Sequence, residues 1–345
     1  MMKKYLTLLC LLISASCLAG NHIPKAADFG AFDAGFDQVF NDVAKYGTNE
    51  LHSLMVVKDG KKIYENYSTG HGPDELHILW SASKTFTSLA IGFAIQDALL
   101  GVEDKVLDFF PDEAPENPSE YLRMMTVKDL LMMASGFSKD YLAPIRSKTV
   151  KEGVKTILAS PVTSRPGTLF KYNSSNTYLL SAIITKVTGK TTEDYLENKL
   201  FKPLDIRRHI WEQSEEGLSC GGWGLFLQTE SMAKAGMFML QEGRWNGKQL
   251  LNPEWIREAS SFKIVNYDKN SLDQEGRSKN ENPDWREGYG YQIWMCTHNA
   301  YRMAGAKCQF VIVIPEKNAV IVTTSQSSGG QNMLDSIWTN IYPVL

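Results

Sequence analysis

Two stretches near opposite ends of the chain each predict a β-hairpin. In residues 51–68 (LHSLMVVKDGKKIYENYS), two apolar runs flank Asp59-Gly60, a dipeptide that strongly favours a tight turn between antiparallel strands. In residues 310–325 (FVIVIPEKNAVIVTTS), the segment from Pro315 to Asn318 separates two runs rich in valine and isoleucine. We therefore expect one sheet assembled from strands that are far apart in the sequence.

Helical periodicity marks the other regular segments. It predicts an amphipathic helix over residues 27–45 and a final helix from roughly Gln331 to Tyr342. Residues 126–136, 176–189 and 231–243 also have helical patterns, and each ends in a glycine suited to a helix C-terminus. This order of elements indicates an α+β fold, a mainly antiparallel β-sheet flanked by N- and C-terminal helices with an inserted helical lobe. The apolar face of the first helix is expected to contain Phe29, Phe32, Phe36, Val39, Phe40 and Val43.

Two segments fall outside this globular pattern. A basic start and a short apolar run predict a secretory signal peptide in residues 1–19, too short for a comfortable membrane span. The alternative is a lipoprotein signal, because small residues precede Cys17, and lipidation of Cys17 would attach the protein to a membrane. The polar stretch from about 264 to 287 predicts a surface loop.

Composition and missing motifs exclude several classes of protein. The chain has 36 basic and 39 acidic residues and no basic block, so a nucleic-acid partner is not expected. It contains no G-x-S-x-G elbow, no phosphate-binding P-loop and no HExxH zinc motif. The histidines are scattered without metal-ligand spacing, so we expect no metal site and structural or surface roles for His22, His52, His71, His77, His209 and His298. An odd number of cysteines follows the predicted leader, which leaves one disulfide or only free thiols open for Cys220, Cys296 and Cys308.

The pattern S-x-x-K is the remaining candidate for chemistry. It places a serine and a lysine one helical turn apart on the same face, where the amine can reach the hydroxyl. The serine needs a base, and lysine can serve if burial and its neighbours lower its pKa towards 7. The chain contains this pattern three times, at residues 81–84, 231–234 and 260–263.

The surroundings of the three copies differ. Ser81 and Lys84 open a segment that is apolar almost all round, which predicts a buried helix and therefore a buried amine. Lys234 belongs to an amphipathic helix and is expected on its solvated face, while Lys263 adjoins the polar loop and lacks an apolar shell. A buried amine beside a hydroxyl is the condition that a catalytic base requires, so Ser81 and Lys84 are the candidate nucleophile and base.

The residues from position 80 onward (WSASKTFTSLAIGFAIQDALLGVEDKVLDFFP) resemble the serine β-lactamase and penicillin-binding protein superfamily. The likeness is to the branch that contains class C β-lactamases, D-Ala-D-Ala carboxypeptidases, esterases and 6-aminohexanoate-dimer hydrolases. Further similar blocks follow in the family order: MTVKDLLMMASG, PGTLFKYNSSNTYLLSAIITKVTGK, GGWGLFLQTESMAKAGMFMLQEGRWNGKQLL, GYGYQIW and MAGAKCQFVIVIPEKNAVIVTTS. The resemblance implies a β-lactamase/transpeptidase-like fold. We expect a single catalytic domain over 24–345, with an α/β part at about 24–98 and 285–345 and a mostly helical part at about 99–284.

A second family motif, often Y-x-N, supplies the group that relays a proton to the leaving atom. Here it matches Tyr172-Asn173-Ser174, so the resemblance implies that Tyr172 is the relay, with serine in the third position. Ser174-Ser175-Asn176 also spells S-x-N, the second motif of other branches. The preceding PGTLFKY sequence favours Tyr172.

The third family motif is usually a Lys or His, a small residue and a Gly on an edge strand beside the nucleophile. It matches residues 303–305 (Met-Ala-Gly), so the cation is missing, which disfavours penicillin or D-Ala-D-Ala chemistry. The resemblance implies that the backbone N–H groups of Ser81 and Ala306 hold the oxyanion. Lys307 either restores a positive charge near the pocket or points to solvent, and Cys308 stands where relatives tend to carry glycine.

Together these patterns predict a secreted serine hydrolase, periplasmic or extracellular, that cleaves an amide or ester bond through an acyl-enzyme on Ser81. Lys84 and Tyr172 would act as base and proton relay, without a cofactor, on a small molecule or peptide that carries an ester or amide carbonyl. The alternative is a penicillin- or peptidoglycan-binding module that is acylated, or only binds, without turnover. The residues expected to hold the oxyanion or the substrate are Ser174, Gly305, Ala306 and Lys307. The segment from Gly221 to Leu225 and four aromatic residues either wall the pocket or pack in the core: Trp285, Tyr289, Tyr291 and Trp294.

Overall fold

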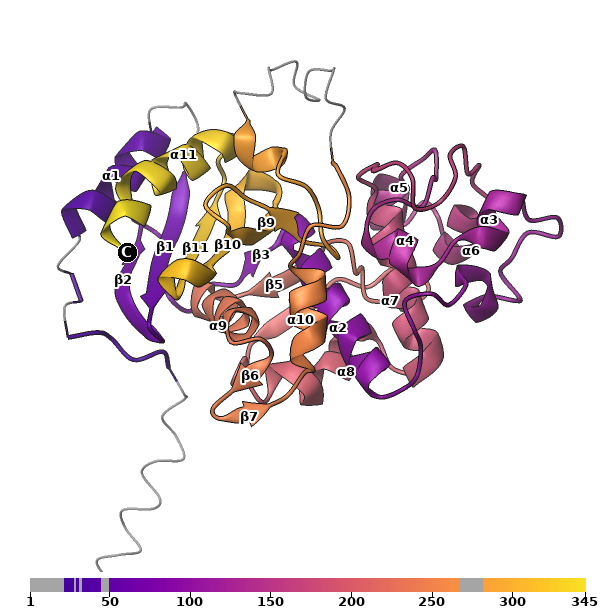
Figure 1. Cartoon of the computed structure of the whole chain (residues 1–345), viewed down its shortest axis with the longest axis horizontal. Helices are drawn as coiled ribbons and strands as arrows, with labels where there is room; N and C mark the ends of the chain where they lie inside the picture. Colours follow the sequence, from indigo (N-terminus) through magenta and orange to yellow (C-terminus); the bar gives the residue numbers. More distant parts are fainter. Residues whose placement is uncertain (1–21, 28, 31–32, 45–49, 267–281) are drawn as a thin grey trace, which may run out of the picture.

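The computed structural model describes residues 22–27, 29–30, 33–44, 50–266 and 282–345. The predicted leader with Cys17 lies outside these residues, as do Phe32 and the side chain of Val43. Figure 1 shows a sheet flanked by helices at one end of the molecule and a helical lobe at the other. The predicted α+β architecture is confirmed.

Six strands form the main sheet, in the order β2-β1-β11-β10-β9-β8, and every neighbouring pair is antiparallel. Both predicted hairpins are confirmed, and β1 of the first pairs with β11 of the second. Asp59 and Gly60 turn with φ of 49° and 75°, the left-handed backbone that a two-residue hairpin requires. The strands are β1 (Leu51–Lys58), β2 (Lys61–Tyr67), β8 (Trp294–Met295), β9 (Tyr301–Gly305), β10 (Gln309–Ile314) and β11 (Ala319–Ser325).

Helices cover both faces of this sheet. Along β11, Val320 and Val322 join the apolar cluster on the side of α9 (Thr229–Leu240), while Ile321 joins the cluster beneath α1 and α11. Side chains of a strand alternate between faces, so a sheet covered on both faces is apolar at nearly every position. The two terminal helices are α1 (Asp33–Ala44), which is shorter than predicted, and α11 (Gly330–Asn340).

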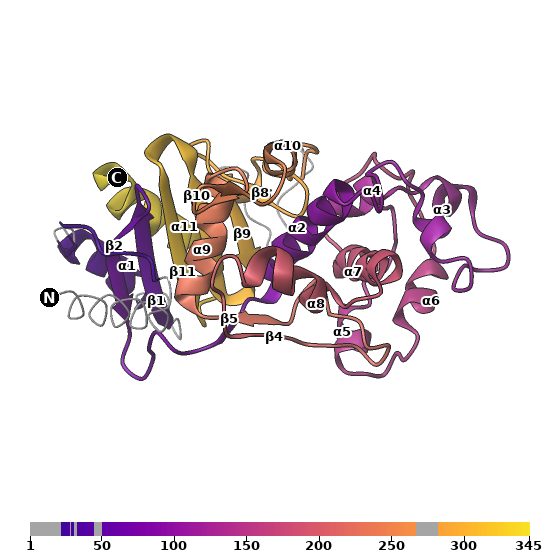
Figure 2. The same cartoon turned by 90° about the horizontal axis from the view of Figure 1, so that it is seen from below.

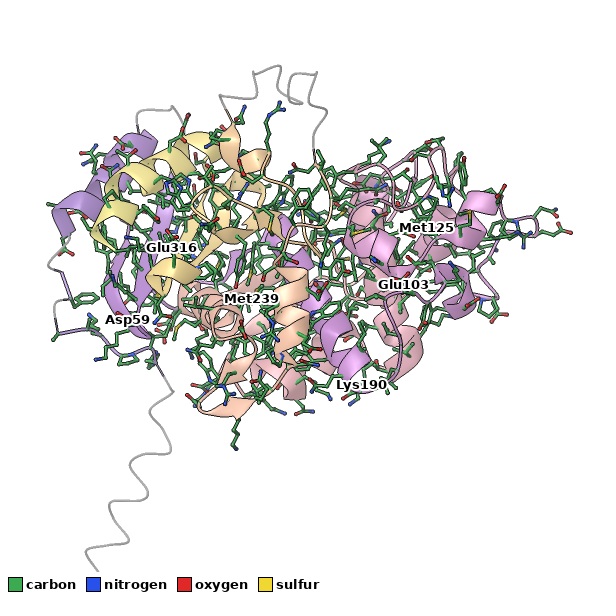
Figure 3. The ribbon with its side chains drawn as sticks, viewed as in Figure 1. Asp59, Glu103, Met125, Lys190, Met239 and Glu316 are labelled. Atoms are coloured by element: carbon green, nitrogen blue, oxygen red, sulfur yellow. The ribbon has the colours of Figure 1, made fainter. Side chains whose placement is uncertain are left out.

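A long buried helix, α2 (Ser83–Gln96), connects the sheet to the helical lobe and packs against α7 (Ser174–Thr188). Figure 2 shows α2 between the two parts. In Figure 3, Glu103, Met125 and Lys190 lie in the helical lobe, whereas Asp59, Met239 and Glu316 lie in the sheet part. Because α9 falls between residues 99 and 284 and packs on the sheet, that expected helical part also contributes to the sheet layer.

The other elements are short. The remaining helices are α3 (Glu120–Met124), α4 (Val127–Leu131), α5 (Leu142–Arg146), α6 (Gly153–Leu158), α8 (Thr192–Leu196) and α10 (Pro253–Ala259). A three-stranded sheet contains β3 (His77–Ile78), β4 (His209–Trp211) and β5 (Leu225–Leu227). A two-stranded sheet contains β6 (Arg244–Trp245) and β7 (Lys248–Gln249). Among the described residues, no helix has the length and apolar character needed to cross a bilayer.

The prediction of a surface loop from about 264 to 287 is wrong for the C-terminal end of that segment. Residues 267–281 lie outside the described residues, but Asn282, Asp284 and Arg286 are buried. The Asp284 carboxylate accepts hydrogen bonds from Gln331 and Trp338 of α11, so this segment packs under the last helix. Its polar side chains are thus paired in the interior, which composition alone cannot distinguish from exposure.

Candidate active site

Ser81 lies in a tight turn, Trp80–Ala82, that connects β3 to α2. Trp80 has φ of 47°, a left-handed conformation that costs a bulky residue about 1–3 kcal/mol. The turn is tied to the neighbouring strand, because the backbone N–H of Leu225 donates to Ser83 Oγ at 3.2 Å. A strained, anchored turn thus presents Ser81 at the partly exposed start of an otherwise buried helix.

The Lys84 amine lies one helical turn further on and is 1% exposed. Its Nζ atom is 3.2 Å from Ser81 Oγ, 3.1 Å from Ser174 Oγ and 2.7 Å from the carbonyl oxygen of Gly222. An ammonium donates to all three oxygens. A neutral amine has two donors and one lone pair, so it can donate to Gly222 and Ser174 and accept from Ser81. Both protonation states therefore fit the same three neighbours.

Burial lowers the pKa of Lys84 to about 7, and the negative charge of Asp140 partly opposes this effect. Lys84 forms no ion pair with any carboxylate in the described part of the chain. A lysine with this pKa is half neutral near pH 7, the state in which it can accept a proton. The buried amine that the sequence predicted is present.

The ring of Tyr172 lies on the other side of the amine, with its centroid 5.0 Å from Lys84 Nζ. It stacks on Trp294 at 5.6 Å and meets Tyr289 edge-on at 6.3 Å. Burial raises the pKa of the Tyr172 phenol, although its hydrogen bond with Ser81 partly opposes the shift. The phenol is therefore protonated at neutral pH and can donate a proton, but it is not a resting base.

Ser174, at the start of α7, also lies at the amine. Its backbone N–H donates to Asp140 Oδ2 at 2.9 Å, and the Asn173 side chain caps the helix by accepting from Ser175 N–H at 2.9 Å. The Asn176 side chain makes its contact away from the amine: its oxygen accepts a hydrogen bond from Ser135 Oγ at 2.7 Å. The serine of the alternative S-x-N motif is thus at Lys84, whereas the asparagine is not.

Gly305, at the end of β9, packs directly against the nucleophile turn. A Cβ atom on this glycine would lie 2.0 Å from the carbonyl oxygen of Leu79 and 3.2 Å from the backbone nitrogen of Ala82. The glycine therefore allows the strand to approach the turn closely. The structure thus brings together Ser81, Lys84, Tyr172, Ser174 and Gly305. Ala306 follows Gly305 in the chain and is exposed.

The third-motif position has no cation. Met303 is 1% exposed and lies in the core cluster on the α9 side. Arg302 does not replace the missing charge, because its guanidinium lies 4.2 Å from the Trp285 ring centroid in the other cluster. Lys307 is exposed, and its amine forms no hydrogen bond or ion pair with the other residues that the structure describes. Cys308 has φ of 59°, a backbone conformation that favours glycine.

Two functional contacts were missed by the sequence analysis. The sequence indicates Gly222 only as part of a segment that either walls the pocket or packs in the core, yet its carbonyl oxygen accepts the shortest hydrogen bond of Lys84. Asp140 carries no motif, and it lies 34 residues before Ser174 in the chain. Tyr289 and Trp294 do border the site through Tyr172, while Tyr291 packs on Trp255 instead.

The other two S-x-x-K copies do not form such a site. Lys234 is not on a solvated face as predicted: it is 5% exposed and donates to the backbone oxygen of Asp205 at 3.0 Å. Its end is covered by the segment that carries Asp205, which amphipathicity alone cannot indicate. Lys263 pairs with Glu258, and in the described structure no hydrogen bond joins either lysine to its motif serine. The three cysteines after the predicted leader are buried free thiols.

The sequence and the fold of this chain are similar to those of known proteins. The Beta-lactamase family model matches residues 51–343. The chain is 22% identical over 265 residues to the 6-aminohexanoate-dimer hydrolase of Paenarthrobacter ureafaciens, covering 72% of this chain and 64% of that protein. It is 27% identical over 175 residues to Protein flp of Staphylococcus aureus (strain COL), covering 47% and 35%. The aligned part is thus less than two thirds of either relative.

Solved structures share the fold. The octameric penicillin-binding protein homologue from Pyrococcus abyssi superimposes with a TM-score of 0.67 at 19% identity, over 89% of this chain and 77% of that one. At this level of identity the similarity establishes the architecture, which is the β-lactamase/transpeptidase-like fold predicted from the sequence.

Proposed function

Because the chain belongs to the β-lactamase family, we propose that it is a serine hydrolase that cleaves an ester or amide bond through an acyl-enzyme on Ser81. The observation that carries this proposal is the position of the Lys84 amine, buried and 3.2 Å from the Ser81 hydroxyl. A pKa of about 7 allows this amine to accept the serine proton at neutral pH. The name of the Paenarthrobacter relative supports hydrolysis as the type of reaction.

In the first half-reaction, neutral Lys84 takes the proton of Ser81 as Ser81 Oγ attacks the substrate carbonyl carbon. The carbonyl oxygen becomes an oxyanion, which the backbone N–H groups of Ser81 and Ala306 would stabilise. Loss of one such donor typically costs about 3–4 kcal/mol of transition-state stabilisation. The close packing of Gly305 on the nucleophile turn supports this arrangement, because it fixes the end of β9 beside Ser81.

The tetrahedral intermediate then collapses, and the leaving amine or alkoxide receives a proton. Tyr172 is the proposed donor, because its phenol is protonated and its ring lies 5.0 Å from Lys84 Nζ. The Tyr172 phenolate that results then takes the proton that Lys84 holds. In the second half-reaction, Lys84 takes a proton from water, the hydroxide attacks the acyl carbon, and Ser81 leaves with a proton returned from Lys84.

We further propose that the protein acts outside the cytoplasm, directed there by residues 1–19 or attached to a membrane through Cys17. Its substrate is a small molecule or peptide with an ester or amide carbonyl. The buried Met303 in place of a cation favours substrates that lack a carboxylate at this position. The same residue supports the alternative function, a module that is acylated or binds without turnover.

Intact-mass spectrometry after treatment with a fluorophosphonate probe tests the proposal. We expect one adduct on the wild type and on Ser260→Ala, which removes the serine of another S-x-x-K copy, and no adduct on Ser81→Ala. Absence of an adduct on the wild type, or its persistence on Ser81→Ala, would refute the assignment. Turnover of a panel with a p-nitrophenyl ester, nitrocefin and a D-Ala peptide then separates the two functions, since an adduct without any turnover favours the binding module.

A further inference from the structure

Three of the six histidines lie together at one edge of the sheet part, although the sequence predicted scattered, unrelated positions. The rings of His52 and His71 are stacked with centroids 3.8 Å apart, and that of His77 is 5.5 Å from His52. Two glutamates complete the group, Glu50 and Glu75. The spacing gave no signal because the group is assembled from β1, β3 and the loop between β2 and β3.

Local structure aims these side chains at one another. The pairing of β1 with β11 shifts register between Leu51 and Ser53, so His52 sits at an irregularity of the type that redirects a side chain. The backbone oxygen of His52 accepts from the N–H of Ser68 at 3.0 Å, which holds the loop against β1. His77 is fixed by the pairing of β3 with β5.

Two buried ring nitrogens in this group have no hydrogen-bond partner among the described residues, His52 Nδ1 and His77 Nε2. His77 is 6% exposed, so bulk water does not readily satisfy its ring. Its Nε2 atom faces Glu75 Oε2 at 3.7 Å, which is too long for a hydrogen bond. Unpaired polar atoms in the interior are costly, so this arrangement calls for a partner.

We propose that His52, Glu75 and His77 bind one divalent transition metal ion, for which Zn²⁺ is the best match. One ligand atom from each of the three residues lies within 4.8 Å of the other two. Ligand atoms around tetrahedral Zn²⁺ lie about 3.3 Å apart, given bonds of roughly 2.0–2.1 Å. Side-chain rotations that bring the ligand atoms closer by up to about 1.5 Å therefore complete the site. Two imidazoles and a carboxylate favour Zn²⁺ over Ca²⁺ or Mg²⁺, which prefer oxygen ligands.

A second layer of contacts supports the carboxylate. His71 Nδ1 lies 2.7 Å from Glu75 Oε2, and His71 Nε2 lies 3.2 Å from Glu50 Oε1. A carboxylate ligand that is also hydrogen-bonded to a neighbouring side chain keeps its orientation towards the metal.

The metal would join two parts of the sheet structure. His52 belongs to the six-stranded sheet, whereas His77 belongs to the three-stranded sheet and lies four residues before Ser81. Bound Zn²⁺ would therefore link β1 to β3, the strand that leads into the nucleophile turn. This assignment is independent of the hydrolase proposal, because it concerns binding and stability alone.

The test uses purified full-length protein without an oligohistidine tag, treated with EDTA, desalted and titrated with ZnCl₂ by calorimetry. We expect one equivalent to bind, with affinity at least tenfold lower in His77→Gln and in Glu75→Gln. Glu75 is partly exposed, so Glu75→Gln keeps the test valid if His77→Gln fails to fold. The matched control is His209→Gln: His209 also lies between two glutamates, but Glu193 and Glu197 contact opposite ring nitrogens and cannot share one ion with the ring.

Thermal unfolding provides the second measurement. With free Zn²⁺ at about 100 times its dissociation constant, the melting temperature of the wild type and of His209→Gln should rise by about 3 °C or more. That of Glu75→Gln, with affinity at least tenfold lower, should rise by about half as much or less. The proposal is overturned if the wild type binds no Zn²⁺, or if Glu75→Gln and His77→Gln bind it as tightly as the wild type does.

Discussion

Lys84 Nζ lies 3.1 Å from the hydroxyl oxygen of Ser174, a residue ninety positions further along the chain. The same nitrogen contacts Ser81 and the Gly222 carbonyl, so three separate segments converge on one amine. In the proposed mechanism, the protonation state of this amine controls whether Ser81 can lose its proton.

The rate of Ser81 acylation should depend on pH through Lys84. Burial lowers the pKa of Lys84 to about 7, and only the neutral amine accepts a proton. We expect the rate with a fluorophosphonate probe to rise about tenfold per pH unit below pH 7 and to level off above it. Stopped-flow or quenched mass-spectrometric measurements from pH 5 to pH 9 check this, and a flat profile over that range would contradict the role of Lys84.

Asp140→Asn should move this profile to lower pH. The Asp140 charge raises the pKa of Lys84 against the larger effect of burial, so its removal lowers that pKa further. Asparagine keeps an oxygen that can accept from Ser174 N–H. The control is Asp59→Asn in the hairpin turn, where Asn-Gly is equally favourable and the profile should not move. A shift to higher pH, or an equal shift in both variants, would disprove the electrostatic link.

Lys84→Met should abolish acylation and yet stabilise the folded state at pH 7. The lowered pKa, compared with 10.5 for an exposed lysine, corresponds to a penalty of about 4 kcal/mol. Leaving the Gly222 carbonyl unpaired costs about 1–3 kcal/mol, and the Ser174 hydroxyl loses the same partner, so the gain in stability is smaller than the penalty that is removed.

The difference in folding stability between Lys84→Met and the wild type should change with pH in a definite direction. The folded protein binds fewer protons than the unfolded chain between pH 7 and pH 10.5, so the stability of the wild type rises with pH in that window. The penalty is fully present below pH 7. Urea unfolding at pH 7 and pH 9 should show the advantage of Lys84→Met shrinking by about 1.4 kcal/mol per pH unit. An advantage that does not change with pH would mean that Lys84 is not neutral in the folded protein.

Tyr172→Phe and Ser174→Ala distinguish the two candidates for the proton relay. If Tyr172 protonates the leaving group, Tyr172→Phe should lower kcat by about 10²–10⁴ on an amide or alkyl ester. It should have less effect on a p-nitrophenyl ester, whose leaving group needs no proton. Ser174→Ala should cost about tenfold on both substrates, as loss of one contact to Lys84. A larger loss of kcat with Ser174→Ala than with Tyr172→Phe on the amide or alkyl ester would assign the relay to Ser174.

Gly305→Ala should eliminate acylation without directly altering Ser81, Lys84 or Tyr172. Its Cβ would lie 2.0 Å from the Leu79 carbonyl oxygen, so β9 and the nucleophile turn must separate. We expect a loss of at least 10²-fold, comparable to removing one oxyanion donor. Gly72→Ala is the control, because open space surrounds that position and its backbone is not left-handed. Full labelling of Gly305→Ala would show that the close packing is dispensable.

The elements that the sequence predicted are those set by local pattern. The two hairpins follow from Asp59-Gly60 and from Pro315–Asn318 between apolar runs, and the buried helix of Lys84 follows from its unbroken apolar character. These features depend on residues within a few positions of each other, which a single sequence displays.

The missed features all depend on distant segments. Nothing near Asp140 indicates that its carboxylate reaches the start of α7, and nothing near Gly222 marks its carbonyl as a partner for Lys84. Lys234 occupies a polar position of its helix, but another segment covers it. His52 and His77 meet only because two sheets adjoin. Tertiary packing decides these cases, and one sequence does not reveal it.

The order of strands has a consequence for synthesis. The first hairpin pairs with the last, and Gly305 completes the surroundings of a serine that leaves the ribosome more than two hundred residues earlier. Such long-range pairing cannot begin until β9, β10 and β11 have been synthesised. A nascent chain that stops before β11 thus carries Ser81 and Lys84 in an unfinished framework, and the proposed chemistry becomes possible only after the second hairpin has formed.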